Sequence, residues 1–465
     1  YNVLWDKSDN QLEFGANAKA SFGGSLQIYH DGSHSRLTNS TGAISLQTNL
    51  VNFANAANNK SLAVMTDAGS VDLYYNGNKK FETTNTGAIV TGICTATSFS
   101  GSGENLTRTT PYSHRNIINN GDMRVVQRAT SASFDDHGND IEVCDRWNYN
   151  RHGVTATVAQ VAEAPDGRGF KYSMKWTSTS AVGGSLHAGN NLKWIYQIEG
   201  QDIRRLGYGH SNAKTATLSF YAKGSLAGKI GVSCVRDSRI FSTNVDMTAN
   251  TWQLHTIVIP ADTSTAFSAS DNANGWQLGI CWGAGSNSTS GTTGGSWIGF
   301  HTAYTAGFTA GQQGAYLTTN GSTFQITGVQ LEMGSVATPF EHRPFSEELA
   351  RCQRYCMVYG DSSQARHLGT AHAYNSTNLN LSIHLPVPMR AKPSASTVTT
   401  GGNWLQSYMG ASGNISNASI SVADHGVNHT SMRLYLQNAH SGLTAGQALW
   451  LHTLANAKLI LSAEL

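Results

Sequence analysis

One short sequence occurs twice near the start of the chain. Residues 24–44 read GSLQIYHDGSHSRLTNSTGAI and residues 69–89 read GSVDLYYNGNKKFETTNTGAI, with nine of 21 positions identical. Each copy alternates apolar and polar residues over four or five positions and is interrupted by turn residues. These turns are expected at Asp31-Gly32 and Thr41-Gly42, and at Asn76-Gly77 and Thr86-Gly87. A unit this small encloses no core of its own, so it needs stacked neighbours or partner chains. The repeat therefore predicts a rod-like, oligomeric β segment.

Composition narrows the class of protein. The 465 residues carry a net charge of +2 and only 13% are charged, which argues against nucleic acid as a partner, since that needs clustered Lys and Arg. With 48 glycines, the chain has the balance of a turn-rich β protein. It contains no apolar run of 18 residues, so we expect no membrane insertion. Because the chain begins with Tyr rather than Met, we expect it to be part of a longer protein.

Turn clusters and composition divide the chain into four parts. We expect a repetitive β shaft and neck over residues 1–111, a β-sandwich or jelly roll over 112–344, a connecting helix over 345–359, and a C-terminal β-sandwich tip over 360–465. The fold class is thus mostly β. In the middle part, the expected strands are 155–161, 172–177, 215–222, 229–235, 252–259, 275–282 and 323–332. In the last part, they are 379–385, 394–399, 415–422, 431–436 and 449–462. Two loops poor in apolar residues, 178–190 and 283–296, are expected to be mobile.

Residues 345–359 have the pattern of a helix. Ser346 is a good N-cap, and two glutamates follow it in the first turn, where the helix dipole favours them. Leu349, Cys352, Gln353 and Cys356 fall on one face by their spacing. We expect Cys352 and Cys356 to pack there as small apolar side chains. The other cysteines, Cys94, Cys144, Cys234 and Cys281, are scattered and are also expected to be buried free thiols.

No metal site is predicted. The segment 135–140, DDHGND, is the densest acidic cluster, but it lacks the spacing of a calcium loop and is expected to be a solvated turn. His425 and His429 have helical spacing in a stretch that reads as a turn, and His367 and His372 are expected on opposite faces of a strand. We expect no cofactor.

The sequence offers no catalytic constellation. It contains no nucleophile elbow, P-loop or dinucleotide fingerprint. Its 29 acidic residues are thinly spread, and residues beyond 110 show no repeated rungs on which a carboxylate pair for glycoside hydrolysis would be built. We therefore expect a protein that is not an enzyme.

Aromatic residues in polar stretches are the best binding candidates. Sugars present apolar C–H faces that stack on aromatic rings, while amides and hydroxyls fix their orientation. One candidate group is Asn403, Trp404, Tyr408 and Asn414, and a second is Arg366, His367, His372 and Tyr374. For Trp404 and Tyr408, core packing is an equal alternative. Among the tryptophans of the middle part, Trp147, Trp194, Trp276 and Trp297, we expect Trp147 and Trp276 in the core because apolar strand residues surround them.

Three passages resemble phage tail fibres, particularly those of marine cyanobacterial phages. The first is the repeat, with LQIYHDGSHS at residues 26–35. The second is NIINNGDMRVVQR at residues 116–128, followed by Asp145-Arg146-Trp147. The third is VQLEMGS at residues 329–335, which continues through TPFEHRP at 338–344 into EELARCQRY at 347–355. In related fibres, the second and third passages open and close a jelly-roll domain similar to carbohydrate-binding modules. The last 105 or so residues carry no such motif.

The resemblance implies a homotrimeric virion fibre that is assembled in the host cytoplasm and binds a glycan on the host surface. It also implies that virion tail proteins hold the fibre through a region before Tyr1. The repeat supports the trimer separately, because three interleaved chains leave no strand edge unpaired. Two alternatives stay open: a tail-spike depolymerase of envelope polysaccharide, and a structural fibre or adaptor that binds no receptor.

Overall fold

The computed structural model describes residues 3–15, 18–95, 114–140, 143–181, 187–265, 267–286, 295–299, 314–360, 363–399, 403–408, 413–416, 419–424 and 430–465, with backbone only at 414, 416 and 424. Residues 182–186 of the predicted loop 178–190, residues 287–294 of the predicted loop 283–296, and both His425 and His429 lie outside these ranges. The chain separates into an N-terminal unit, residues 1–107, and a larger unit, residues 108–465. Within the described ranges, no helix has the length and apolar character needed to cross a membrane.

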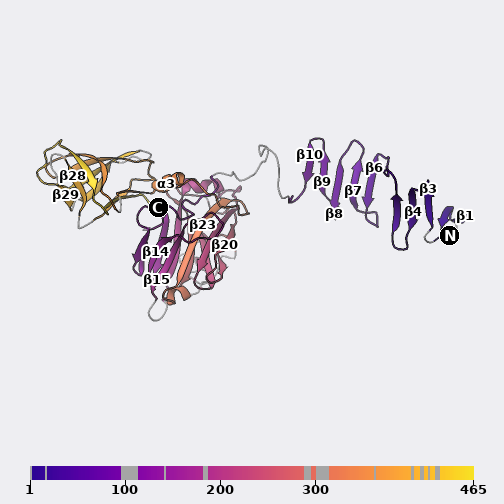
Figure 1. Cartoon of the computed structure of the whole chain (residues 1–465), viewed down its shortest axis with the longest axis horizontal. Coiled ribbons are helices and arrows are strands. Elements are labelled where there is room, and N and C mark those ends of the chain that lie inside the picture. Colours follow the sequence, from indigo (N-terminus) through magenta and orange to yellow (C-terminus); the bar gives the residue numbers. More distant parts are fainter. Residues whose placement is uncertain are drawn as a thin grey trace. The chain divides into compact units, whose positions relative to one another are not determined.

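The N-terminal unit consists of short antiparallel sheets (Figure 1). Its strands are β1 (Val3–Asp6), β2 (Gln11–Phe14), β3 (Lys19–Phe22), β4 (Leu26–His30), β5 (Ser35–Asn39), β6 (Leu50–Ala54), β7 (Ser61–Thr66), β8 (Val71–Tyr75), β9 (Asn78–Thr84) and β10 (Gly87–Val90). The sheets are β1-β2, β3-β4-β5 and β10-β9-β8-β7-β6. The turns predicted inside both copies of the repeat are confirmed. Asp31 caps the first by accepting from the backbone N–H groups of Ser33 and His34, and Asn76 and Gly77 form the second with positive φ angles.

The described residues of the N-terminal unit bury almost nothing. Asp72 is the one side chain there that counts as buried. Large apolar side chains of the strands stay about half exposed, among them Phe53, Leu62, Leu73 and Ile89. The sequence prediction that the repeat cannot enclose its own core is therefore confirmed.

The middle sandwich packs a six-stranded sheet, β11-β14-β15-β23-β17-β20, on a seven-stranded sheet, β12-β13-β16-β21-β18-β19-β22. The strands are β11 (Ser131–Phe134), β12 (His137–Asp140), β13 (Trp147–His152), β14 (Thr155–Val161), β15 (Ser173–Ser180), β16 (Asn191–Glu199), β17 (Ala216–Gly224), β18 (Gly228–Arg236), β19 (Arg239–Met247), β20 (Gln253–Ile259), β21 (Asn274–Ala284), β22 (Ile298–Gly299) and β23 (Thr323–Met333). The short helical turns α1 (Gly200–Ile203), η2 (Arg204–Leu206) and α2 (Ala315–Thr318) complete it. All seven strands predicted here are confirmed.

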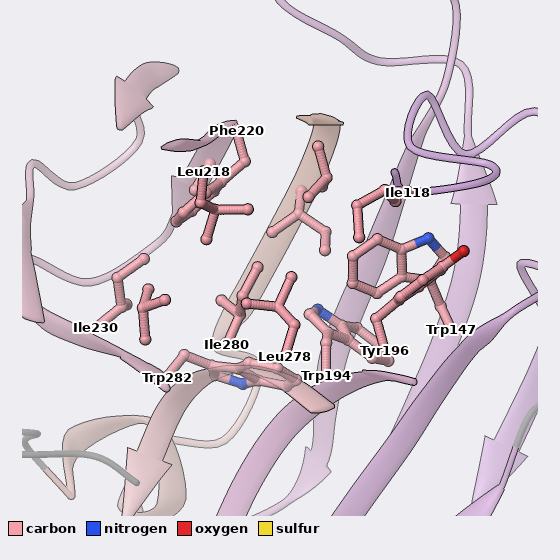
Figure 2. Close-up of a cluster of buried hydrophobic side chains, with 14 of the residues drawn as sticks. Ile118, Trp147, Trp194, Tyr196, Leu218, Phe220, Ile230, Leu278, Ile280 and Trp282 are labelled. Atoms are coloured by element: carbon pink, nitrogen blue, oxygen red, sulfur yellow. The ribbon is translucent and has the colours of Figure 1, made fainter. Parts of the chain in front are cut away.

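Tryptophans fill the space between the two sheets. Figure 2 shows Trp147, Trp194 and Trp282 converging with Leu278 and Ile280, all of them almost completely buried. Trp282 stacks on Phe324 across the core, with ring centroids 4.7 Å apart and planes at 12°. The predicted core positions of Trp147 and Trp276 are confirmed, and Trp194 and Trp297 are buried as well.

Hydrogen bonds link residues 116–128 of this sandwich to residues 329–355. The Asn116 side chain donates to the carbonyl of Val329, 3.1 Å away, and its own oxygen accepts from the backbone N–H of Leu331. Gln330 accepts from the N–H of Glu341 at 2.8 Å, and the Glu341 carboxylate accepts from the N–H of Asn116. Because these groups are buried or half-buried, leaving any of them without a hydrogen-bond partner would lower the free energy of unfolding. The hydrogen bonds thus tie the first residues of the sandwich to its last strand.

The predicted helix is shorter than expected. Helix α3 (Phe345–Gln353) starts one residue before Ser346, and the carbonyl of Pro344 accepts from the N–H groups of Glu347 and Glu348. Residues 356–359 are not helical, because β24 (Cys356–Gly360) pairs with the last strand of the chain. Cys352 and Cys356 are both buried thiols, as expected, but they lie on different elements. Cys94 is exposed, so the prediction of burial is wrong for that thiol.

The C-terminal sandwich packs a three-stranded sheet, β24-β33-β27, against a seven-stranded sheet, β29-β28-β32-β25-β26-β31-β30, here called the aromatic sheet. The strands are β25 (Arg366–Ala373), β26 (Leu379–His384), β27 (Ser394–Val398), β28 (Asn403–Tyr408), β29 (Gly413–Ser416), β30 (Ser419–Asp424), β31 (Ser431–Gln437), β32 (Ala448–Thr453) and β33 (Lys458–Ser462).

Three of the five strands predicted in this part are confirmed, and the other two are each divided. The stretch 415–422 forms the ends of β29 and β30, and 449–462 forms β32 and β33. Between β32 and β33, Asn456 adopts a φ of 64° and the N–H of Ala457 donates to the carbonyl of Leu454. This left-handed turn sends the two halves into different sheets.

Buried charges join the two sandwiches. Arg146, 2% exposed, donates to Glu464 at 2.6 Å and lies over the ring of Tyr355, 3.5 Å from its centroid. Glu464 also approaches Arg128, with 3.4 Å between the nearest atoms. Arg354 on the C-terminal side binds the carboxylate of Glu199 with two bonds of 2.7 and 2.8 Å. Such bidentate pairs fix orientation as well as contact.

We expect Glu464→Ala to destabilise the larger unit strongly. The change leaves Arg146 buried without its carboxylate, and breaking a buried pair in this way costs about 3–5 kcal/mol. Urea unfolding followed by tryptophan fluorescence measures the loss. As a control, Asp246→Ala removes the exposed pair with Lys229 and should cost less than about 1 kcal/mol. Equal losses for the two variants would contradict the role given to Glu464.

His255 predicts an acid-sensitive component of stability. Its side chain is 7% exposed between Phe220 and Met247, and burial lowers its pKa to about 4. A depressed histidine pKa means that the unfolded chain takes up the proton first, so stability is lost as the pH falls from about 6.5 to 4. Relative to His255→Phe, the wild type should lose about 3 kcal/mol between pH 7 and pH 4. Urea unfolding at each pH provides the measurement, and the exposed His210→Gln should keep the wild-type slope.

Candidate functional site

The aromatic sheet has one face in the core and one face open. Along β32, Leu449, Leu451 and Thr453 are buried, while Trp450 is 50% exposed and His452 is half-buried. The neighbouring strands alternate in the same way, because successive side chains of a strand point to opposite faces. The inward side chains pack against the three-stranded sheet, so the outward side chains remain at the surface.

Strand register brings the outward rings together. Tyr408 on β28 lies opposite Trp450 on β32, and His452 lies opposite His367 on β25. The rings of Tyr408 and His452 are 4.9 Å apart, those of His452 and His367 are 5.1 Å apart, and those of His367 and Trp450 are 6.4 Å apart. Four rings from three strands therefore form one continuous surface, here called the ring cluster.

A second row of polar groups adjoins the ring cluster. His372 on β25 lies opposite Asn380 on β26, and Asn380 lies opposite Tyr435 on β31. The Asn380 amide is 3.4 Å from the ring nitrogen of His372. Tyr374 contacts Tyr435 edge to face, with centroids 5.8 Å apart, and is 60% exposed. Amides, phenols and imidazoles thus extend the face across five strands.

The face carries no negative charge over its central strands. Strands β25, β26, β28, β31 and β32 contain no Asp or Glu, while they contain four histidines and two arginines. Burial and the neighbouring His367 lower the pKa of His452, so this imidazole is neutral near pH 7. A neutral imidazole both donates and accepts hydrogen bonds, as a hydroxyl-rich ligand requires.

The structure places Tyr408, from the first group predicted from sequence, on the same sheet face as members of the second group. Tyr408, His367 and His372 share the open face, and Arg366 and Tyr374 are exposed on or beside β25. The prediction that His367 and His372 point to opposite sides is wrong, because a bulge between His367 and Gly369 adds a residue to β25 and returns both to one face.

Trp404 does not reach the surface. It is 1% exposed and packs in the core, so it offers a ligand no ring face. Asn403 is half-buried beside it, and the Asn414 side chain lies outside the described part of the chain. Trp450, His452 and Tyr435 were missed by sequence reasoning. The alternation in ALWLHT at residues 448–453 is the signal that places Trp450 and His452 on one side and the two leucines on the other.

Two of the three aspartates in the acidic segment 135–140 pair with Arg151. Arg151 donates to Asp135 at 2.6 Å and to Asp140 at 2.8 Å, and these bonds lower the pKa of Asp135. His137–Asp140 form β12, while Asp135 and Asp136 connect it to β11, so the prediction of a turn is wrong for the last four residues of the segment. Among the described residues, the acidic side chains that approach one another closely enough to share an ion are Asp6, Asp9 and Glu13, mostly exposed at the first hairpin. Exposed carboxylates of this kind are ordinary surface groups.

The solved structures named below each cover less than half of this chain. No protein-family model matches the chain, and no curated protein matches it. Among solved structures, the enzymatically active domain of tailspike protein 4 from bacteriophage CBA120 matches 47% of this chain at 11% identity and a TM-score of 0.25, and the match spans 22% of that chain.

Two sugar-binding proteins match at a similar level. TmCBM61, solved in complex with β-1,4-galactotriose, covers 47% of this chain with 99% of its own, at 11% identity and a TM-score of 0.24. A putative sugar-binding protein from Bacteroides thetaiotaomicron covers 47% with 100% of its own, at 13% identity and a TM-score of 0.23. At these scores, the β-sandwich assignment rests on the strand pairing of this chain itself.

Proposed function

We propose that this chain is the receptor-binding subunit of a virion tail fibre and that it attaches the particle to a glycan on the host surface. The observation that carries the proposal is the ring cluster of Tyr408, Trp450, His452 and His367 on an open sheet face. The resemblance of residues 116–128 and 329–355 to tail fibres of marine cyanobacterial phages supports the place of the chain on the virion.

The chemistry of the face suits a polysaccharide. A ring such as Trp450, half exposed, offers its face to the C–H surface of a sugar and releases ordered water on contact. Imidazole, amide and phenol groups around it exchange hydrogen bonds with sugar hydroxyls. The face is open rather than enclosed, which fits an extended polymer better than a small molecule.

Affinity would come from several contacts at once. The N-terminal unit leaves Phe53, Leu73 and Ile89 exposed, and three chains wound together would cover them. A homotrimer presents three copies of the aromatic sheet, so that one bound copy raises the effective concentration of the others. In this proposal, virion tail proteins hold the fibre through a region before Tyr1, and the fibre is assembled in the host cytoplasm.

We propose that the fibre binds without cutting. A glycosidase needs two carboxyl groups held about 5–10 Å apart around a sugar, and the central strands of the face contain no Asp or Glu. The depolymerase alternative therefore has no acid and base on these strands.

The ring cluster is tested by Trp450→Ala in the full chain. We expect binding to envelope polysaccharide from marine cyanobacterial cells to weaken about tenfold or more, because truncating a central stacked aromatic costs about 2 kcal/mol. Immobilised polysaccharide and surface plasmon resonance provide the measurement. Val398→Ala, which shortens an exposed apolar side chain on the opposite sheet, should bind within about twofold of the wild type.

Two results would count against the proposal. Unchanged binding by Trp450→Ala, with the wild type binding well, would remove the ring cluster as the site. Release of reducing ends from the same polysaccharide would favour the depolymerase instead.

The mass of the full chain in solution tests the fibre. Sedimentation equilibrium should give three times the 49.7 kDa of one chain. Phe53→Asp places a charge on the apolar surface of β6 and should shift the protein toward monomer, whereas Val398→Asp in the C-terminal sandwich should stay trimeric. A wild-type monomer would contradict the trimer.

A further inference from the structure

A cleft of about 480 Å³ lies on the outer face of the six-stranded sheet, away from the aromatic sheet. Its floor is formed by outward residues of β17 and β20, Ser219, Tyr221 and Leu254. Its walls come from the segment 167–170 and from the loop 337–342 that follows β23. The volume is within the range of about 300–1,000 Å³ that small ligands occupy in proteins.

Aromatic rings line the cleft. Phe170 is at the centre, with its ring 5.6 Å from Tyr221, 5.0 Å from Phe340 and 5.1 Å from His342, measured between centroids. Phe340 and His342 also contact each other at 4.9 Å. None of the four rings is fully buried, so the group presents ring edges and faces to the cleft rather than to the core.

Glycine makes this arrangement possible. Gly328 interrupts β23 with a φ of +63°, opposite a register shift between Ser219 and Tyr221 on β17. A Cβ atom at Gly328 would stand 2.6 Å from the ring of Phe170. The bulge therefore gives Phe170 its place against the sheet, and bulges commonly redirect side chains in this way next to binding sites.

The polar groups of the cleft favour an anion. Its lining contains Arg168 and His342 and no carboxylate. Arg168 is exposed, and within the described part of the chain its guanidinium makes no ion pair or hydrogen bond. Ser219 is 6% exposed, and across the same described ranges its hydroxyl makes no hydrogen bond. A hydroxyl on the cleft lining that has no protein partner can exchange a hydrogen bond with a ligand atom or a water.

We propose that this cleft binds an acidic sugar unit, one whose ring carries a carboxylate. The rings of Phe170, Tyr221 and Phe340 take the C–H surface of the sugar. Arg168 pairs with its carboxylate, and Ser219 and His342 exchange hydrogen bonds with its hydroxyls. The proposal does not depend on the aromatic sheet. It gives each chain a second saccharide site, selective for charge.

The test uses the full chain with Trp450→Ala, so that the ring cluster contributes little. Trigalacturonate is the acidic probe and maltotriose the neutral one, and isothermal titration calorimetry measures both. We expect trigalacturonate to bind and maltotriose to bind at least tenfold more weakly. Adding Tyr221→Ala should weaken trigalacturonate about tenfold, and adding Arg168→Gln about fivefold with loss of its salt dependence.

Arg204→Gln is the matched control for charge, because Arg204 is exposed on the same unit and paired with Asp271. It should bind trigalacturonate as its parent does. Equal affinity for the two probes, no binding of trigalacturonate, or full affinity in the Arg168→Gln variant would each overturn the proposal. These outcomes are distinct from failure of the ring cluster, which is measured with Trp450 in place.

Discussion

The arrangement of the larger unit depends on one buried charge. Arg146 is 2% exposed, and a guanidinium so far from water is tolerated only where a carboxylate and hydrogen-bond acceptors surround it. Glu464 is that carboxylate, and it comes from the end of the chain. Because Arg146 precedes β13 of the middle sandwich, the pair fixes where the C-terminal sandwich packs. This contact therefore also fixes the position of the aromatic sheet relative to the middle sandwich.

The two units differ in how much of their apolar surface is buried. The larger unit has two sandwiches, each with its own core of buried aromatic and aliphatic side chains. The described strands of the N-terminal unit have the same alternation but no second layer, so both faces remain partly exposed. Hydrophobic burial stabilises a fold only where a second layer exists. For the N-terminal unit, the proposed homotrimer would supply that layer.

All the strands predicted in the middle sandwich are found, but sequence reasoning did not predict its long strands β16 and β19. The pattern at 155–161 predicts β14 to the residue, because alternation is a local property. The faces of His367 and His372 were wrong because one extra residue in β25 changes the parity of everything beyond it. The end of α3 was wrong for a similar reason, since Cys356 pairs with Ser462, more than a hundred residues away. Long-range pairing of this kind leaves no trace in a local pattern.

In the C-terminal sandwich, backbone irregularity also places one tryptophan in the core and leaves another at the surface. Trp404 and Trp450 both lie in short strands with mixed polar neighbours, so the local composition does not indicate which of the two is buried. A register shift between Asn403 and Leu405 leaves Trp404 beside Leu405 on the buried side, whereas β32 is regular and Trp450 alternates outward. Irregular backbone thus decides which rings pack in the core and which stay exposed. In the middle sandwich, the bulge at Gly328 leaves room for the ring of Phe170 on the outer face of the sheet, where this ring lines a cleft. In both sandwiches, the inward positions are committed to packing, so binding has to be sought at outward positions and at the bulges that select them.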